Sequence, residues 1–223
     1  MARATATAAT DVIGSRLRRL TGARRYRGAL GVCLVLVACG GSHSARSGPP
    51  QPASRPSGPS GDVAAFHWLR PSPPPPGWHT RSLQGGHATL AYPSEFTPIS
   101  GDFASFSVAV HRGRHYHAFL SIAPQQRDER PAGWAAIRLQ FDRREGGTHI
   151  ATRASAEGLP FRGGPGSCVI DDYNSRVGGR YREIACIVAG PHATTVVVGA
   201  SALGEWRKRA RVLERAVSSF TET

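Results

Sequence analysis

The sequence predicts one α+β domain, a central antiparallel sheet flanked by helices, which follows an export signal and a linker. Short runs of β-type residues with turn signals between them fill the first half of the domain. Two further β-rich segments of matched length surround one loop in the second half, and two segments place their apolar residues at helical spacing. Strands and helices grouped in this way, without a regular strand–helix alternation, are typical of α+β folds.

The first half of the domain is expected to hold three short strands, at residues 88–92, 104–111 and 116–123. Phe106, Val108 and Val110 share one parity along the second of them, as a half-buried antiparallel strand requires. The histidine- and arginine-rich segment 111–115 then forms the turn into the third strand. These segments are expected to be half-buried antiparallel strands.

Two helices are expected. In residues 129–144, Trp134, Ile137 and Phe141 recur at spacings of three and four, which places them on one helix face, and Gly146 and Gly147 follow as a stop signal. The last helix begins near Trp206 and steps its apolar residues by four and three to Phe220, with arginines on the remaining surface. Both helices therefore predict an apolar stripe that packs on the sheet.

The best-determined element is a hairpin of strands 167–173 and 181–189, with one more β-branched strand at 194–200 after it. A register centred on the connecting loop places Cys168 opposite Cys186 and Asp171 opposite Glu183. Two cysteines that face each other in an exported protein predict a disulfide. The loop-entropy model gives such a bridge roughly 3 kcal/mol of stabilisation.

The N-terminal region indicates export and lipid anchoring. Residues 1–38 combine an arginine-rich start with an apolar run at 29–38, too short to span a bilayer of roughly 30 Å as a permanent helix. The run ends in Leu36-Val37-Ala38-Cys39, which resembles the lipobox of bacterial lipoproteins. Cys39 is therefore expected to carry a diacylglyceryl group, with palmitate-type acyl chains, on the outer face of a membrane. The general secretory and twin-arginine routes both stay open.

Residues 39–77 are rich in Gly, Pro and Ser and predict an extended tether, so the folded domain is expected at 78–223. Phe66, Trp68 and Leu69 interrupt this composition and are expected to dock on the domain. The formal charge of the chain is +13, of which residues 1–38 supply seven arginines and one aspartate, so the part from Cys39 onward carries +7. A basic envelope protein can attract an anionic polymer or lipid. Nucleic acid is excluded by export and by the absence of a nucleic-acid motif.

Several phrases resemble the PsbP-like fold, which includes photosystem II extrinsic proteins and bacterial envelope lipoproteins. They are the segment Ala91-Tyr-Pro-Ser-Glu-Phe-Thr-Pro98, the helix around Trp134, the strand around Tyr181-Arg-Glu-Ile-Ala185, and the last helix with its Ser218-Ser-Phe220 end. The resemblance implies an α/β/α sandwich and a role in binding or assembly, because members of this fold commonly act without catalysis.

Two groups of residues are candidates for chemistry. His111, His115 and His117 surround one turn, and His115 and His117 share a strand face, which suits zinc or copper. A metal site needs three or four ligands, and no carboxylate or cysteine lies nearby in the sequence, so an exposed polar turn is favoured and no metal or cofactor is expected.

The second group is Asp171 and Glu183, flanked by Tyr173 and Tyr181 on the face opposite the disulfide. Facing carboxylates repel unless a cation or an arginine neutralises them or one holds a proton. Paired carboxylates also perform glycoside hydrolysis. A strand pair that is ion-paired with the nearby Arg180 or Arg182, or simply solvated, is favoured over ligand binding and over catalysis.

These observations together predict a non-enzymatic binding or assembly module of the cell envelope, with a protein or an anionic polymer as its partner. A small hydrolase or carbohydrate-binding enzyme that uses Asp171 and Glu183 is the first alternative, and a ligand or metal carrier is the second. No G-x-S-x-G motif, phosphate loop or dinucleotide fingerprint is present in the sequence.

Overall fold

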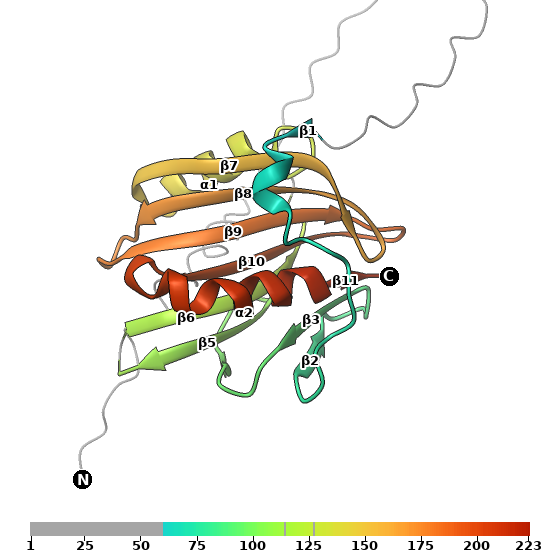
Figure 1. Ribbon diagram of the computed structural model, residues 1–223, viewed down its shortest axis with the longest axis horizontal. Helices are drawn as coiled ribbons and strands as arrows, with labels where there is room; N and C mark the ends of the chain where they lie inside the picture. Colours follow the sequence, from blue (N-terminus) through green and yellow to red (C-terminus); the bar gives the residue numbers. More distant parts are fainter. Residues whose placement is uncertain (1–59, 114, 127) are drawn as a thin grey trace, which may run out of the picture.

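The computed structural model describes residues 60–113, 115–126 and 128–223, which form two antiparallel sheets and two α-helices (Figure 1). The large sheet has eight strands in the order β1-β7-β8-β9-β10-β6-β5-β4, and the small one has the order β11-β3-β2. The strands are β1 (Ser60–Gly61), β2 (His79–Ser82), β3 (Ala88–Tyr92), β4 (Thr97–Ile99), β5 (Phe106–Arg112), β6 (His115–Pro124), β7 (Thr148–Phe161), β8 (Gly164–Asn174), β9 (Arg180–Ala189), β10 (Thr194–Ala202) and β11 (Thr221–Glu222).

The two α-helices lie on opposite faces of the large sheet. Figure 1 shows α2 (Trp206–Ser219) in front of β10 and β6, and α1 (Trp134–Arg144) behind β7 and β8. The α2 stripe buries Leu213, Val217 and, just after the helix, Phe220 in the main core, while Arg207, Arg211 and Arg215 are exposed. None of the helices in the described part of the chain is long and apolar enough to cross a membrane.

The predicted α+β class is confirmed. The large sheet dominates the fold, however, and its two faces are not evenly covered by helices as in an α/β/α sandwich. Helix α1 packs mainly on β7 and β8 and reaches the centre of the sheet through Trp134, which contacts a second apolar cluster on that face. The 11-residue helix is too short to cover β6 and β5 as well, since it rises only about 1.5 Å per residue. Part of one sheet face therefore lacks a helical layer.

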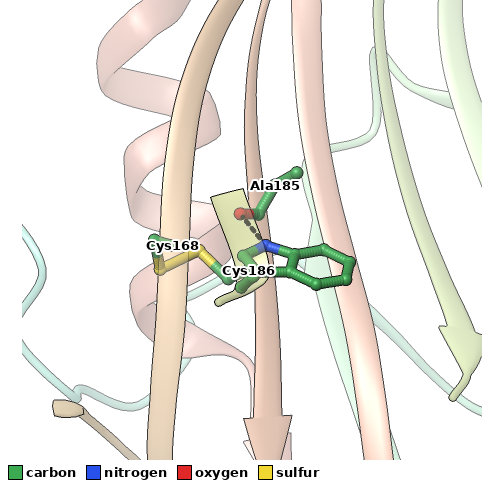
Figure 2. Close-up of a disulfide and its surroundings, with 4 residues drawn as sticks. Cys168, Ala185 and Cys186 are labelled. Atoms are coloured by element: carbon green, nitrogen blue, oxygen red, sulfur yellow. Dashed lines mark hydrogen bonds between the residues drawn. A yellow bond between two sulfur atoms is a disulfide. The ribbon is translucent and has the colours of Figure 1, made fainter. Parts of the chain in front are cut away.

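The β8–β9 hairpin has the predicted register. Cys168 faces Cys186, Asp171 faces Glu183, and Tyr173 faces Tyr181. The Cys168–Cys186 disulfide is confirmed and lies in the main core on the α2 side. Figure 2 shows the disulfide beside Ala185. The indole nitrogen of Trp134, which packs on the opposite face of the sheet, donates a 2.9 Å hydrogen bond to the carbonyl oxygen of Ala185. The hairpin therefore contributes to the main core on one face of the sheet and to the second apolar cluster on the other.

The longest strand, β7, was not predicted from the sequence. It pairs with β8 through three register shifts, and its 14 residues include Gly158 and Pro160 as well as many exposed polar side chains. Bulges of this kind break the two-residue alternation on which strand prediction depends. Arg162 and Gly163 form the tight turn that joins β7 to β8.

The predicted boundary at residue 78 is wrong, because the folded unit already includes residues 60–77. Strand β1 pairs with β7, and the short 3-10 helix η2 (Val63–Phe66) follows it. Phe66 and Leu69 are 2% and 5% exposed, so the predicted docking of these side chains is confirmed. Their burial supplies the apolar contacts that offset the ordering entropy of a Pro-rich segment. The expected signal peptide and Cys39 lie outside the described residues.

Candidate functional site

A pocket of about 610 Å³ lies where α1 leaves the sheet uncovered. Its floor comes from β6 and β10, with Phe119, Ser121 and Val198 among the floor residues. Helix α1 supplies one wall, and the segments around residues 102–105, 124–126, 128–129 and 175–177 supply the rest. This volume lies in the range of pockets that hold small organic ligands, about 300–1,000 Å³.

A buried ion cluster forms the wall beside α1. The guanidinium of Arg138 donates to both carboxylate oxygens of Glu183, at 2.6 and 2.9 Å, and lies 3.1 Å from an oxygen of Asp142 one helical turn along α1. The side chains of Arg138 and Glu183 are 5% and 0% exposed. Such a bidentate pair fixes both groups in one geometry, because each charge would be strongly destabilised without the other.

The charges in this cluster shift the pKa values of its members. Burial alone would lower the pKa of Arg138, but the carboxylates of Asp142 and Glu183 outweigh it and raise that pKa, so the guanidinium stays charged. Burial raises the pKa of Asp171 to about 6, and the charge of Glu183 adds to the effect. Burial followed by the charge of Glu183 likewise raises the pKa of Tyr173 well above its ordinary value, so Tyr173 stays neutral.

Asp171 is the least satisfied member of the cluster. It is 0% exposed, and neither carboxylate oxygen has a hydrogen-bond partner of normal geometry. The Thr152 hydroxyl across β7 and β8 lies near enough to lower the pKa of Asp171, although less than burial raises it. A buried carboxyl without donors is more stable protonated, which agrees with the direction of its pKa shift.

The structure places the predicted pair Asp171 and Glu183 beneath α1 instead of on an accessible surface. Neither residue lines the pocket. Tyr173 does line it, whereas Tyr181 stacks on Tyr173 with ring centroids 6.0 Å apart and donates a 3.2 Å hydrogen bond to the carbonyl of Tyr116. The four residues are thus neighbours, but only Tyr173 of the four reaches the cavity.

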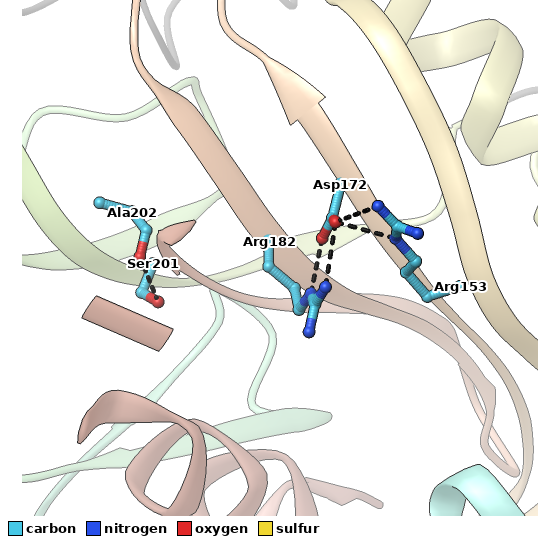
Figure 3. Close-up of polar contacts among 5 residues, drawn as sticks. All are labelled: Arg153, Asp172, Arg182, Ser201 and Ala202. Atoms are coloured by element: carbon cyan, nitrogen blue, oxygen red, sulfur yellow. Dashed lines mark hydrogen bonds and ion pairs between the residues drawn. The ribbon is translucent and has the colours of Figure 1, made fainter. Parts of the chain in front are cut away.

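The predicted ion pair exists, but with another arginine. Arg182 binds Asp172, not Asp171 or Glu183, and Arg153 of β7 completes that clamp on the other face of the sheet (Figure 3). These bonds outweigh burial and lower the pKa of Asp172. Arg138, the partner of Glu183, was missed because it is 45 residues away in sequence. Its one local signal is its place four residues after Trp134, inside the apolar stripe of the helix.

The buried carboxylates also form the one group among the described residues whose spacing suits a metal ion. One oxygen each from Asp142, Asp171 and Glu183 lies within 4.8 Å of the others. Arg138 already bonds to Glu183 and Asp142, so its guanidinium supplies the positive charge that a metal ion would otherwise supply. His115 and His117 belong to no such group in the described part of the chain. His115 is exposed beside the β5–β6 turn and His117 is half-buried.

Comparison with known proteins gives structural similarities alone, since no family model and no curated protein sequence matches. Cyanobacterial PsbP (CyanoP) from Synechocystis sp. PCC 6803 has a TM-score of 0.48 and 12% identity, over 66% of this chain and 93% of that one. A protein of unknown function from Pseudomonas aeruginosa has a TM-score of 0.37 and 8% identity, over 64% and 94%.

LpqN, involved in cell envelope biogenesis of Mycobacterium tuberculosis, has a TM-score of 0.30 and 15% identity, over 76% of this chain and 86% of LpqN. All three similarities are below a TM-score of 0.5 and below 25% identity. The α+β class is therefore assigned from the sheets and helices of this chain alone. The similarities assign no activity.

Proposed function

We propose that this chain is a lipid-anchored binding module on the extracytoplasmic face of a membrane, and that the pocket beside α1 is its binding site. The observation that carries the proposal is the pocket's wall of fixed, paired charges above an apolar floor. A cavity whose walls are rigid before a ligand arrives loses little entropy on binding.

The same geometry favours binding over hydrolysis. A hydrolytic pair needs one carboxyl that gives a proton and another that reaches the substrate or a water molecule. Glu183 is held by both oxygens in its bond to Arg138, and Asp171 is fully buried away from the cavity. A substrate in the pocket would meet neither group, so the arrangement supports a non-enzymatic module with no cofactor.

The membrane anchor is the second part of the proposal and rests on the sequence. Cys39 follows Leu36-Val37-Ala38, and Gly, Pro and Ser dominate the stretch between it and the folded unit at Ser60. Two acyl chains on Cys39 would hold the chain on the membrane stably, whereas one chain gives marginal binding. The anionic polymer expected from the overall charge would meet the exposed arginines of α2, not the pocket.

The anchor is tested by Cys39→Ala, with Cys33→Ala as a matched control inside the apolar run. Cys39→Ala should abolish labelling with a clickable palmitate analogue and move the chain out of the membrane fraction, whereas Cys33→Ala should change neither. Retention of the Cys39→Ala chain in membranes after signal cleavage would contradict lipid anchoring.

The binding site is tested by a photo-cross-linking amino acid at Phe103, which is 82% exposed and lines the pocket. The matched control is the same amino acid at Val63, which is 38% exposed and is not among the pocket residues. Irradiation of intact cells should give a discrete adduct of constant mass from position 103 and none from position 63. Equal labelling at both positions, or none at 103, would refute the pocket as the binding site.

A further inference from the structure

The pocket is acidic although the chain is strongly basic. Among the residues that the structure describes, five acidic and three basic side chains line it, whereas the whole chain has a formal charge of +13. The acidic ones are Asp102, Asp128, Glu129, Asp142 and Glu145, and the basic ones are Arg138, Arg144 and Arg176. Asp171 and Glu183 lie behind this wall and do not line the pocket. An acidic hollow in a basic protein attracts cations into itself and not to the surrounding surface.

Glu129 supplies a buried acceptor that lacks a donor. Its residue is 5% exposed, and its Oε2 accepts a 2.8 Å hydrogen bond from the backbone nitrogen of Gln126. The side chain of Gln125 donates to the Glu129 carbonyl, which fixes the local backbone. The other carboxylate oxygen, Oε1, is buried without a hydrogen-bond partner. A native protein rarely leaves a buried carboxylate oxygen unsatisfied, so Oε1 can accept a hydrogen bond from a further donor.

Aromatic rings complete a surface that suits an organic cation. Phe103, Phe119, Phe141 and Tyr173 line the pocket. Two arginines already lie over Phe141, with Arg138 at 5.0 Å and Arg144 at 5.8 Å from the ring centroid. Phe141 is thus covered by arginines, whereas the ring of Phe103 is 82% exposed and open to a ligand. Ammonium groups bind to aromatic faces by cation–π attraction, which strengthens as water is excluded.

An anionic head group is disfavoured in the same place. The basic residue closest to the buried cluster, Arg138, is already neutralised by Glu183 and Asp142. An anion beside Arg138 would therefore meet a guanidinium that is already paired, whereas the exposed Arg144 at the end of α1 also lines the pocket. Repulsion between a ligand anion and the carboxylates of the pocket would lower the affinity for that anion.

From these observations we propose that the pocket binds an organic cation, an ammonium group carried on an apolar body of aromatic or short alkyl type. The ammonium satisfies Glu129 Oε1, and the apolar body lies on the phenylalanine-lined floor. This inference rests on the proposed function and specifies its ligand. The same chemistry could be offered by a free amine or by a lysine side chain in a peptide.

The test uses the full chain in mild detergent and three isosteric probes, measured by isothermal titration. Phenethylammonium carries the cation, 3-phenylpropionate an anion, and 2-phenylethanol no charge. Acetyl-Phe-Lys-amide serves as the peptide form of the cation. At least one cationic probe should bind at least about tenfold more tightly than the neutral and anionic probes. Binding of only the free amine indicates a small-molecule source, and binding of only the dipeptide indicates a peptide source.

The variant Glu129→Gln keeps the shape and the acceptor for Gln126 but removes the charge, and it should weaken the cationic probe at least about tenfold. Glu205→Gln, an equal change of charge just before α2 on the other face, should weaken it less than about twofold because solvent screens the distant charge. Should Glu129→Gln fail to fold, the ranking of the isosteric probes on the parent chain still decides the question.

Three results overturn the inference: neither cationic probe binds, the anion or the alcohol binds as tightly as the cation, or a folded Glu129→Gln chain binds the cation unchanged. The proposed function fails separately. An adduct at position 103 in cells, with no binding of either cation, refutes the ligand class and leaves the binding site in place. Cation binding in vitro without an adduct in cells supports the ligand class and contradicts the site's use in the membrane.

Discussion

Removal of the Arg138 side-chain charge should destabilise the fold strongly. In Arg138→Met the buried carboxylate of Glu183 loses both of its hydrogen-bond donors and its counter-charge, and Asp142 loses its 3.1 Å contact. Breaking one partner of a buried pair typically costs about 3–5 kcal/mol, because the remaining charge stays buried. A domain of this size is stable by about 5–15 kcal/mol, so the loss takes a large part of the total.

The assay is urea unfolding of the purified chain at pH 7.5, followed by far-ultraviolet circular dichroism. Urea is chosen over guanidinium because it does not screen the ion pair. The matched control is Arg143→Met, the same substitution at the next arginine of α1, which is exposed; it should change the free energy of unfolding by less than about 0.5 kcal/mol.

A second variant isolates the cause. Adding Glu183→Met to Arg138→Met removes the stranded charge, so the double variant should recover at least half of the lost stability. A cost below about 1 kcal/mol for Arg138→Met, or no recovery in the double variant, would refute the claim that this pair fixes α1 on the sheet.

Three other perturbations follow from the structure. The folded pKa of Asp171, about 6, lies above its ordinary 3.8, so its contribution is fully present below about pH 4 and is lost as the pH rises through 6. Asp171→Asn should remove that loss, so its stability relative to the parent should rise by about 2 kcal/mol between pH 4 and 7. A flat difference over that range would contradict the pKa shift. Reduction of Cys168–Cys186, which closes a loop with a sequence separation of 18, should cost about 3 kcal/mol in thermal or urea unfolding. An unfolding midpoint that does not change on reduction would contradict a stabilising role of this disulfide. Phe66→Ala should cost about 3–5 kcal/mol by the same assay, because Phe66 is 2% exposed, and a loss under 1 kcal/mol would place η2 outside the cooperative unit.

Local patterns predicted much of the fold. The β8–β9 register followed from the symmetric placement of Cys168 and Cys186 about one loop, and the structure has that register in every pair from Gly166↔Val188 to Asn174↔Arg180. The α2 stripe and strand β3 were predicted for the same reason, since the residues that define each element are close in sequence. By contrast, β7 was missed because its bulges and exposed polar residues hide the alternation.

The candidate site divides in the same way. The sequence indicated that Asp171 and Glu183 face each other and need a neutralising group, but it pointed to Arg180 or Arg182 as that group. The actual partner, Arg138, comes from a helix that packs across the sheet, and no local spacing relates residues 45 positions apart. Glu129 was placed inside the predicted helix, whereas α1 begins at Trp134 and leaves Glu129 in the segment that lines the pocket.

The sequence by itself determined the α+β class, the hairpin register, the disulfide and the apolar stripes of both helices, because these depend on short-range periodicity and on turn geometry. It also carries the lipobox pattern at Cys39. The tertiary structure alone decided which arginine neutralises Glu183, where the folded unit begins, and that the sheet face beside α1 stays open as an acidic pocket. Those features depend on how a helix of fixed length lies across a wider sheet, and packing distances between separate elements are not written in the spacing of residues along one of them.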